Sequence, residues 1–264
     1  MIRFNHHSQF GYDTFPDLHP IDGQPYVNTY QDNACIGQMD GIAFLFEPRS
    51  ISMIGPAYDY VEQYSDNFTL IFTHDSRILE KPNAYYFNWA DVWLTTDSPK
   101  TKGISIVSSW KDWCPLHKAR ISLARMFELS KKVDVYGTYN DPSNKDMRAV
   151  PPETYLENYK FSIILENDID DLWFTEKILN CFSTKTVPIY LGARKIGDVF
   201  NDKGIIQVND WMEIPEVVNN LDIDSYDSYL PYINDNFERV KEYTTPWNER
   251  FFKAYTDVIE DIYG

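Results

Sequence analysis

The stretch "YKFSIILENDIDDLWFTEKILNCFSTKTVPIYLG", residues 159–192, runs through a strand, a loop, a helix and a second strand in direct succession. "FSIILE" (161–166) and "TVPIYLG" (186–192) are short apolar runs typical of buried strands. Between them, residues 175–183 have the apolar spacing of an amphipathic helix. A strand, a helix and a second strand in this order predict a parallel sheet with a crossover helix, so the fold class is α/β.

The alternation continues on both sides of this stretch. Upstream lie a strand at 104–109, a helix over about 115–130, a strand at 132–137 and a helix near 152–158, and downstream a strand at 204–208. This succession predicts a doubly wound domain, and we place it at residues 104–245. The polar segment "TTDSPKTKG" (95–103) carries Pro and Gly and is the best candidate for a linker.

The preceding residues predict a second α/β lobe over 1–100. Its first forty residues show little periodicity and are interpreted as irregular. Strands are expected at 41–48, 68–73 and 84–89, and a helix at 57–64, while residues 246–264 form a helix that could pack back onto this lobe. Two Rossmann-like lobes with the active site in the cleft between them are therefore expected, because ligands of such folds bind at the carboxyl ends of the strands.

The charge balance restricts the partners. Forty Asp and Glu against 24 Lys and Arg give a formal net charge of −16, which argues against nucleic acid or an anionic membrane as a partner. No segment approaches the roughly 18-residue apolar run of a membrane span, and the N-terminus lacks a signal-peptide core. We therefore expect no integral membrane segment and a cytoplasmic location. Cys35, Cys114 and Cys181 are scattered and are interpreted as reduced thiols. Cys114 and His117 form half of a zinc pattern, but no second pair lies at a suitable spacing, so Cys114 is interpreted as a packed cysteine.

The start of the helix after residue 174 is a candidate anion site. Thr175 is a suitable N-cap, which puts Glu176 and Lys177 in the first turn. A lysine there opposes the helix macrodipole unless an anion lies in front of it. The Glu176 carboxylate could accept both hydroxyls of a ribose, and Lys177 could bind a diphosphate. The alternative is an ordinary solvated helix start.

A second interpretation uses the acidic pair in the same loop. Asp168 and Asp170 directly follow the strand and could hold Mn²⁺ or Mg²⁺ on a nucleotide-sugar diphosphate. Acidic pairs are frequent in a chain this acidic, so a solvated loop is the competing interpretation. We expect no required metal or other cofactor, although a divalent ion remains possible.

Residues 159–192 resemble the signature of the glycosyltransferase family 10 fucosyltransferases. In that pattern a "YKF" strand precedes Glu-Asn, five variable residues, an aromatic residue, one further residue and Thr-Glu-Lys, and a "VP-x-x-x-G" strand follows. The spacing from Glu166 to Lys177 fits without a gap, and Gly192 falls where expected. Upstream, "SS" (108–109), "KAR" (118–120) and "KVDVYG" (132–137) are similar to a further family block, so the likeness covers about residues 104–210.

This resemblance implies a donor site for GDP-fucose. Lys177 and Arg120 would neutralise the diphosphate and act as electrostatic catalysts for its departure. Glu176 would receive the ribose hydroxyls, and Glu166 and Asn167 would line the same pocket. Trp173 would also line it, but the family usually has Tyr at this position, so a hydroxyl contact to the donor is lost.

The catalytic base is expected in the first lobe. "FLFEPRS" (44–50) resembles the family's "NFESP" element, whose glutamate deprotonates the acceptor, and this implies that role for Glu47. Glu47 ends an apolar strand, where desolvation raises the pKa of a carboxyl, and Pro48 restricts its backbone to an extended conformation. The alternative is a loop glutamate that pairs with Arg49.

The sequence therefore predicts a GT-B-like enzyme of bacterial or viral type. Its predicted reaction is the inverting transfer of L-fucose from GDP-β-L-fucose to a hydroxyl of a saccharide acceptor. The alternatives are a metal-dependent transferase that uses another nucleotide sugar, and a non-catalytic module that binds a sugar nucleotide or a glycan.

Overall fold

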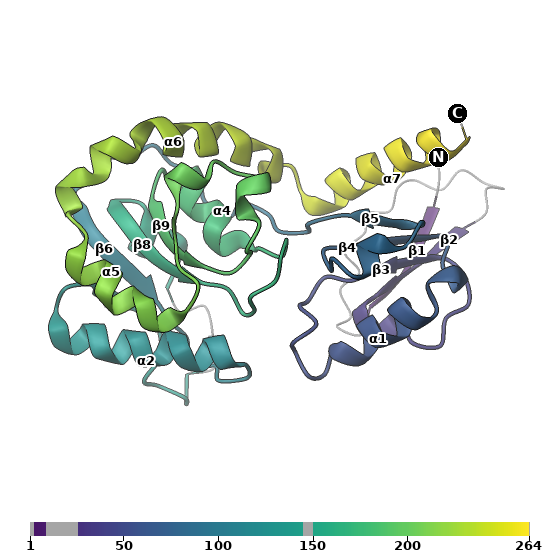
Figure 1. Ribbon diagram of the computed structural model, residues 1–264, viewed down its shortest axis with the longest axis horizontal. Helices are drawn as coiled ribbons and strands as arrows, with labels where there is room; N and C mark the ends of the chain where they lie inside the picture. The colour runs from purple at the N-terminus through teal and green to yellow at the C-terminus, as the bar shows by residue number, and fades with distance from the viewer. Residues whose placement is uncertain (1–2, 9–25, 145–149, 264) are drawn as a thin grey trace. The chain divides into compact units, whose positions relative to one another are not determined.

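The computed structural model describes residues 3–8, 26–144 and 150–263, and the chain divides into two compact units (Figure 1). Unit 1 contains Met1–Trp89, Asp170–Trp173 and Pro246–Gly264, and unit 2 contains Ala90–Ile169 and Phe174–Thr245. Compared with the bounds expected from the sequence, residues 90–100 belong to unit 2 and residues 170–173 to unit 1. None of the helices in the described ranges combines the length and the apolar character that a membrane span needs.

Within the described residues, unit 1 has a parallel sheet of five strands in the order β1-β2-β3-β4-β5. The bounds are Arg3–Ser8 for β1, Tyr26–Gln31 for β2, Ile42–Phe44 for β3, Leu70–Thr73 for β4 and Ala84–Tyr86 for β5. The three strands expected in residues 41–89 are confirmed.

Strands β1 and β2 correct the expectation that the first forty residues are irregular, although residues 9–25 lie outside the described residues. These strands carry polar side chains that pair with each other: His6 Nδ1 lies 2.9 Å from Thr29 Oγ1, and Asn5 donates to Asn28. Because such pairs leave no apolar alternation, the sequence pattern could not indicate these strands.

The sheet of unit 1 packs a helix on each face. Helix α1 (Gly55–Gln63) lies on one face and α7 (Trp247–Tyr263) on the other (Figure 1). Ala43 and Ile71 point to the cluster that contains residues of α1, whereas Phe44 and Phe72 join the cluster that contains Phe251 of α7. Helix α7 therefore completes an aromatic core, in which the ring centroids of Phe44 and Phe251 lie 4.4 Å apart.

The described part of unit 2 also has a parallel five-stranded sheet, in the order β10-β9-β8-β6-β7. The bounds are Lys102–Val107 for β6, Asp134–Tyr136 for β7, Tyr159–Leu165 for β8, Val187–Leu191 for β9 and Ile206–Gln207 for β10. The strand order reverses between β6 and β8, since the chain runs from β6 outward to β7 and then crosses back. In doubly wound folds ligands bind beyond the carboxyl ends of the strands at this reversal.

Helices cover both faces of the second sheet. Figure 1 shows α2 and α5 on one side of it and α4 and α6 on the other. The bounds are Pro115–Ser130 for α2, Pro152–Leu156 for α3, Glu176–Ser183 for α4, Ile214–Asn220 for α5 and Tyr226–Arg239 for α6. Short 3-10 helices lie at Asp32–Cys35, Ser65–Asn67, Ile78–Glu80, Ile196–Asp198, Asp202–Gly204, Trp211–Glu213, Ile223–Ser225 and Val240–Thr244.

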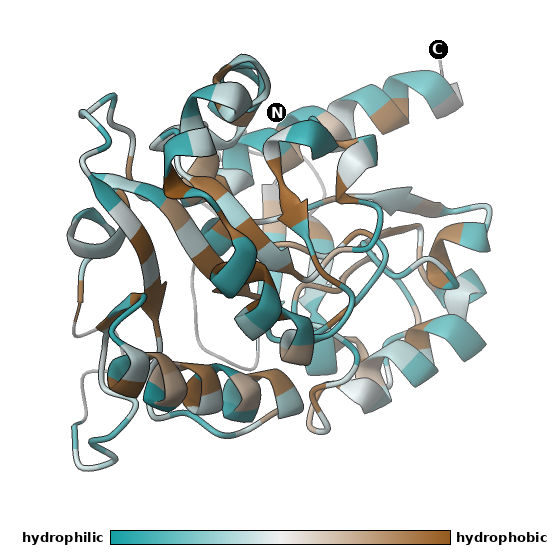
Figure 2. Cartoon of the chain, turned by 60° about the vertical axis from the view of Figure 1, so that its left-hand side comes forward, coloured by the Kyte–Doolittle hydropathy of each residue, from teal (hydrophilic) through white to brown (hydrophobic). Residues whose placement is uncertain are grey.

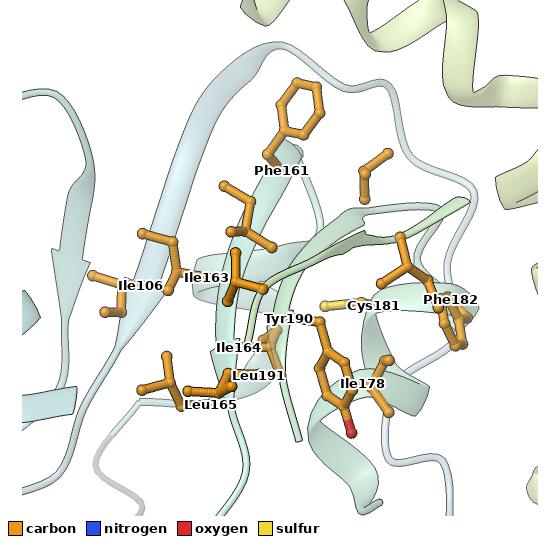
Figure 3. Packing of buried hydrophobic residues seen from close by; sticks show 14 of the residues in the cluster. Ile106, Phe161, Ile163, Ile164, Leu165, Ile178, Cys181, Phe182, Tyr190 and Leu191 are labelled. Carbon is orange, nitrogen blue, oxygen red and sulfur yellow. The ribbon is translucent and has the colours of Figure 1, made fainter. Parts of the chain in front are cut away.

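The core of unit 2 lies between the central strands and these helices. The helices alternate apolar and polar residues along their length, and the strands carry apolar bands (Figure 2). Phe161, Ile163 and Leu165 of β8, together with Tyr190 of β9 and Ile178 of α4, belong to one buried cluster (Figure 3). The loops at the carboxyl ends of β6 and β8 are thus supported by a packed core.

Gly137, at the end of β7, shows why this position needs glycine. Its φ is +104°, and a Cβ atom there would lie 2.2 Å from the Ser108 carbonyl oxygen. The residue that follows β7 can therefore pass close to the end of β6 only without a side chain.

Candidate active site

Arg120 of α2 reaches the carboxyl end of β8. Its Nη2 atom donates to the carbonyl oxygens of Leu165 at 2.7 Å and Glu166 at 3.2 Å, and to Asn167 Oδ1 at 3.3 Å. Burial lowers the pKa of the guanidinium, and the charge of Glu166 acts in the opposite direction. A cation is therefore fixed at the point where the strand order of unit 2 reverses.

Glu166 is fully buried directly after β8. Its Oε1 accepts from the backbone N–H of Thr175 at 2.9 Å, and its Oε2 accepts from the Thr175 hydroxyl at 2.7 Å and lies 3.3 Å from Lys177 Nζ. A Cβ at Gly192 would lie 2.6 Å from Glu166 Cγ, so the glycine after β9 leaves room for this side chain. A buried carboxylate needs such partners, and these close the loop between β8 and α4.

The contacts of Glu166 lie within the protein. Its carboxylate has no exposed surface and is hydrogen-bonded to Thr175, and its predicted place in a donor site stays a prediction. It fixes the loop that presents Asn167 and the first turn of α4. The sequence pattern indicated Glu166 and could not show these contacts, because a pattern does not reveal which partners a carboxylate finds.

The first turn of α4 has the expected construction. Thr175 is the N-cap, and its Oγ1 accepts from the Lys177 backbone N–H. Lys177 Nζ donates to Thr175 Oγ1 at 2.8 Å and lies 3.4 Å from Glu176 Oε1, and the side chains of Glu176 and Lys177 are 17% and 24% exposed. Burial would lower the pKa of Lys177, but the charges of Glu176 and Glu166 raise it above its usual value. The ammonium is therefore retained and partly accessible.

His117 contacts the group of Arg120, Asn167 and Lys177, which we call the cation cluster, although the sequence indicated His117 only as part of an incomplete zinc pattern. Its Nε2 lies 3.0 Å from Asn167 Oδ1, the oxygen that also accepts from Arg120. Burial, followed by the positive charge of Arg120, lowers the pKa of His117 to about 4, so the ring is neutral at pH 7 and donates from Nε2. In the described part of the chain, His117 Nδ1 and Arg120 Nε are buried without a hydrogen-bond partner.

The acidic pair of the loop is divided between the two units. Asp168 Oδ1 accepts from the N–H of Ile169 at 2.8 Å in unit 2. Asp170 Oδ1, in unit 1, accepts from the N–H of Leu172 at 3.2 Å and lies 3.7 Å from His74 Nδ1. Among residues 3–8, 26–144 and 150–263, no group of three or more His, Cys, Asp or Glu side chains could hold a metal ion.

Trp173 belongs to unit 1, whereas Arg120 and Lys177 belong to unit 2. Its side chain is 1% exposed, and its indole N–H donates to the Phe46 carbonyl at 3.0 Å. The predicted role of Trp173 as a lining residue of a donor pocket stays a prediction. The indole offers an N–H where tyrosine offers a hydroxyl, and a buried N–H must find an acceptor.

Glu47 follows β3 in unit 1. Its backbone N–H donates to Asp32 Oδ1 at 3.4 Å, and its carbonyl accepts from the Tyr58 hydroxyl at 2.6 Å. The residue is partly buried. The neighbouring Arg49 forms ion pairs with Asp59, Glu62 and Asp75.

A family model described as "Glycosyltransferase family 10 (fucosyltransferase) C-term" matches residues 96–257. This chain belongs to glycosyltransferase family 10. The matched range contains the whole cation cluster of unit 2, and Glu47 lies outside it.

Two curated relatives share this family 10 region. The α-(1,3)-fucosyltransferase FucT of Helicobacter pylori is 28% identical over 103 residues, which are 38% of this chain and 20% of that protein. A putative fucosyltransferase-like protein of Arabidopsis thaliana is 23% identical over 163 residues, 61% of this chain and 31% of that protein. The family 10 chain thus matches less than a third of the length of either relative.

Solved structures show the fold of this family 10 protein. An α1,3-fucosyltransferase solved with GDP has a TM-score of 0.53 and 13% identity, with 86% of this chain and 82% of that chain covered. TarM has the same TM-score of 0.53 at 9% identity, with 88% and 54% covered. These likenesses and the two parallel sheets confirm the predicted GT-B-like α/β fold.

Proposed function

We propose that this protein is an inverting fucosyltransferase that moves L-fucose from GDP-β-L-fucose to a hydroxyl of a saccharide. The observation that carries the proposal is the pair of cations, Arg120 and Lys177, at the strand reversal of unit 2. A chain of net charge −16 otherwise repels a nucleoside diphosphate, so binding requires cations held in place locally. Family membership and the solved α1,3-fucosyltransferase with GDP support GDP as the nucleotide.

The donor is held by residues of unit 2. Arg120 and Lys177 face the diphosphate and stabilise the negative charge that grows on it as the bond to fucose breaks. Glu176 accepts hydrogen bonds from the ribose hydroxyls, and Asn167 contributes its amide. Glu166 and Thr175 touch no substrate in this scheme, because they hold Lys177 in position.

Glu47 acts on the acceptor. Its carboxylate takes the proton of the acceptor hydroxyl, and the acceptor oxygen attacks C1 of fucose on the face opposite the diphosphate. The bond between C1 and the phosphate oxygen breaks, GDP leaves with the electron pair, and the β-linked donor yields an α-linked product. Two fixed cations supply the charge for this departure, so the scheme requires no divalent metal.

The test begins with nucleotide binding. Melting temperatures are measured with GDP, UDP and CMP, because a ligand that binds only the folded state raises the melting temperature. GDP is expected to give the largest increase. A larger increase with UDP would favour another nucleotide sugar as donor; the pneumococcal O-GlcNAc transferase GtfA, solved with UDP and GlcNAc, has a similar fold with a TM-score of 0.53.

Transfer is then assayed with GDP-fucose and a panel of disaccharide and glycan acceptors, with and without EDTA. Activity that resists EDTA and an α-linked product in the NMR spectrum are expected. Glu47→Gln should abolish transfer and leave GDP binding intact, whereas Glu80→Gln, at an exposed glutamate of the same unit, should change neither. A protein that binds GDP and transfers no fucose to any acceptor would instead be a binding module.

We also place the protein in the cytoplasm. Cys35, Cys114 and Cys181, all within the described residues, are free and buried thiols. Free thiols persist in a reducing compartment, and this supports the assignment.

A further inference from the structure

Phe46 and Glu47, which follow β3 by two and three residues, have their backbone held by side chains. The backbone N–H groups of Phe46 and Glu47 both donate to Asp32 Oδ1, at 2.9 and 3.4 Å. The Phe46 carbonyl accepts from Trp89 Nε1 at 2.9 Å and Trp173 Nε1 at 3.0 Å. The Glu47 carbonyl accepts from the Tyr58 hydroxyl at 2.6 Å. Both N–H groups and both carbonyls of this dipeptide are thus bonded to side chains.

These side-chain hydrogen bonds take the place of the strand-to-strand hydrogen bonds beyond the end of β3. The N–H of Leu45 still donates to the Phe72 carbonyl at 3.0 Å, which is a contact between neighbouring strands. One residue later the strand contacts stop, and side chains from different parts of unit 1 take over. Most protein hydrogen bonds join backbone to backbone, so a dipeptide whose N–H and C=O groups are bonded to side chains has a position that those side chains help to specify.

The side chains that bond directly to the Phe46–Glu47 backbone form a first layer of contacts, and a second layer, His74 and Asp170, lies behind Tyr58. Since the Tyr58 hydroxyl donates to Glu47, it accepts from His74 Nε2, which lies 2.8 Å away. His74 is buried, and its Nδ1 lies 3.7 Å from Asp170 Oδ1. The chain of contacts therefore runs from Asp170 through His74 and Tyr58 to the backbone of Glu47.

The segment 170–173 contributes to both layers. Asp170 lies next to His74, and Trp173 donates directly to the Phe46 carbonyl. These four residues belong to unit 1, although the chain on either side of them belongs to unit 2. The tryptophan that departs from the family pattern thus has a defined contact in this protein.

We infer that Tyr58 and Trp173 are positioning residues for Glu47, which fix its backbone so that its carboxylate meets the acceptor hydroxyl at a constant place. The inference rests on the proposed function for its catalytic consequence. A displacement of about 1 Å in a reacting group can reduce a rate about 100-fold, so two lost hydrogen bonds are enough to matter.

The test uses Tyr58→Phe and Trp173→Phe, which remove the hydroxyl and the indole N–H and keep an aromatic ring. Each has a matched control in the same chain. Tyr60→Phe removes a hydroxyl of α1 that donates to the Gln38 carbonyl at 2.9 Å. Trp110→Phe removes an indole N–H that donates to the Asn144 carbonyl at 2.7 Å.

The kinetic result should separate positioning from folding. Tyr58→Phe and Trp173→Phe are expected to lower kcat about 10- to 100-fold with the KM for GDP-fucose unchanged, while the controls stay near wild type. In a Glu47→Gln background, the same substitutions should cause no further loss of the residual rate. A full additional loss in that background, or an equal loss in the controls, would overturn the inference, because the side chains would then act elsewhere.

Hydrogen exchange tests whether Tyr58 and Trp173 hold the backbone of Glu47, and this measurement does not depend on fucose transfer. Peptides that cover residues 44–50 are compared in the wild type, the two variants and the two controls. Exchange should become at least about tenfold faster in Tyr58→Phe and Trp173→Phe and stay unchanged in the controls. Unchanged exchange in the variants contradicts the inference even if fucose is transferred, whereas faster exchange in a protein that transfers no fucose contradicts only the proposed function.

Discussion

The segments that follow β8 and β3 both hold proposed active-site residues in place, but by different contacts. After β8, ionised side chains hold each other: Glu166 binds Lys177 through a charge pair and both contact Thr175. After β3, side chains hold the backbone of Phe46 and Glu47, and the Glu47 carboxylate takes no part in those bonds. The first arrangement fixes charges in space, and the second fixes the main chain from which one carboxylate projects.

The difference suits the two proposed tasks. A diphosphate needs cations whose charge is preserved, so carboxylates beside Lys177 keep its pKa high. A general base must present its carboxylate to the acceptor at a fixed place, and contacts to its backbone can set that place. Each prediction below removes one element of this contrast.

The largest effect is expected for Lys177→Met. It leaves the Glu166 carboxylate buried without its cation, which costs about 3–5 kcal/mol and lowers the melting temperature by about 10 °C. Transfer should fall at least about 100-fold, because one of the two charges that stabilise the leaving group is lost. Calorimetry and the transfer assay measure the two consequences.

A double variant separates these consequences. Adding Glu166→Gln to Lys177→Met should restore most of the melting temperature and none of the transfer. Lys160→Met, on β8 itself, removes a pair with the exposed Asp224 and should change both quantities little. Recovery of transfer in the double variant would show that Lys177 serves the fold alone.

A smaller loss is expected for Arg120→Lys. The charge is kept, but the ammonium cannot reproduce the planar group that spans two carbonyls and the Asn167 amide. We expect transfer to fall about 10- to 100-fold with weaker GDP binding in calorimetry. Arg125→Lys, at an exposed position of the same helix, serves as the control, and equal effects in both would contradict the proposed role of Arg120.

The predictability of the two regions from sequence differs for a physical reason. After β8, the contacts among Glu166, Thr175 and Lys177 join residues at most 11 positions apart in the chain, and a helix start has its own sequence signals. Arg120 and His117 reach the same loop from 45 to 50 positions away. Around Glu47, Tyr58 and Asp32 lie 11 and 15 positions away and belong to no helix-start or strand pattern with it, and Phe46 and Trp173 are 127 positions apart. No local pattern encodes such pairs, so the sequence indicated Glu47 and could not indicate Asp32, Tyr58 or Trp173 as its supports.

The prediction of helices and strands from the sequence is limited in the same way, because it depends on a local apolar pattern. The sequence predicts the strands and helices of residues 104–208 almost in full, since buried parallel strands are continuous apolar runs and α2 carries the expected spacing. Strands β1 and β2 were missed because polar pairs such as His6 and Thr29 hide their periodicity. His117 was dismissed because a lone histidine in a helix signals nothing until its neighbours are known.

The next largest effect is the pH dependence of stability that Asp32, beside Phe46 and Glu47, contributes. Burial, and then the charge of Glu47, raise the pKa of Asp32 from 3.8 to about 7, against the hydrogen bond from Phe46 that lowers it. Between about pH 4 and pH 7 the folded protein retains a proton that the unfolded chain has lost, so stability falls as pH rises through this window. Asp32→Asn should therefore melt a few degrees higher than wild type at pH 8 and equal to it at pH 4.

Asparagine is a suitable replacement at this position. Asp32 has a φ of +49°, a conformation that asparagine tolerates, and the amide oxygen can still accept from Phe46 and Glu47. Asp66→Asn, at an exposed position of the same unit, is the matched substitution. A lower melting temperature for Asp32→Asn at pH 8 would mean that the negative charge itself is needed.

The smallest effect is expected for His117→Gln in the region of β8. The pKa of His117 is about 4 in the folded protein and 6.5 in its ordinary state, so the unfolded chain binds an extra proton between these values. Stability from this group is complete above about pH 6.5 and is lost as pH falls toward 4, with a slope of at most about 1.4 kcal/mol per pH unit. The variant keeps a donor for Asn167 and should show a flatter decline, with equal melting at pH 7.5; identical curves at pH 4.5 would contradict this.

The division of unit 1 among separate chain segments has a consequence for synthesis on the ribosome. Phe251, which completes the aromatic core beside Phe44 and Phe72, leaves the exit tunnel only after all of unit 2. The earlier-made β1 to β5 must therefore wait, with one apolar face uncovered, until residues 246–263 are made. A chaperone that shields extended apolar segments would act on the N-terminal strands during that interval, and a stop codon before residue 246 would leave them without their cover.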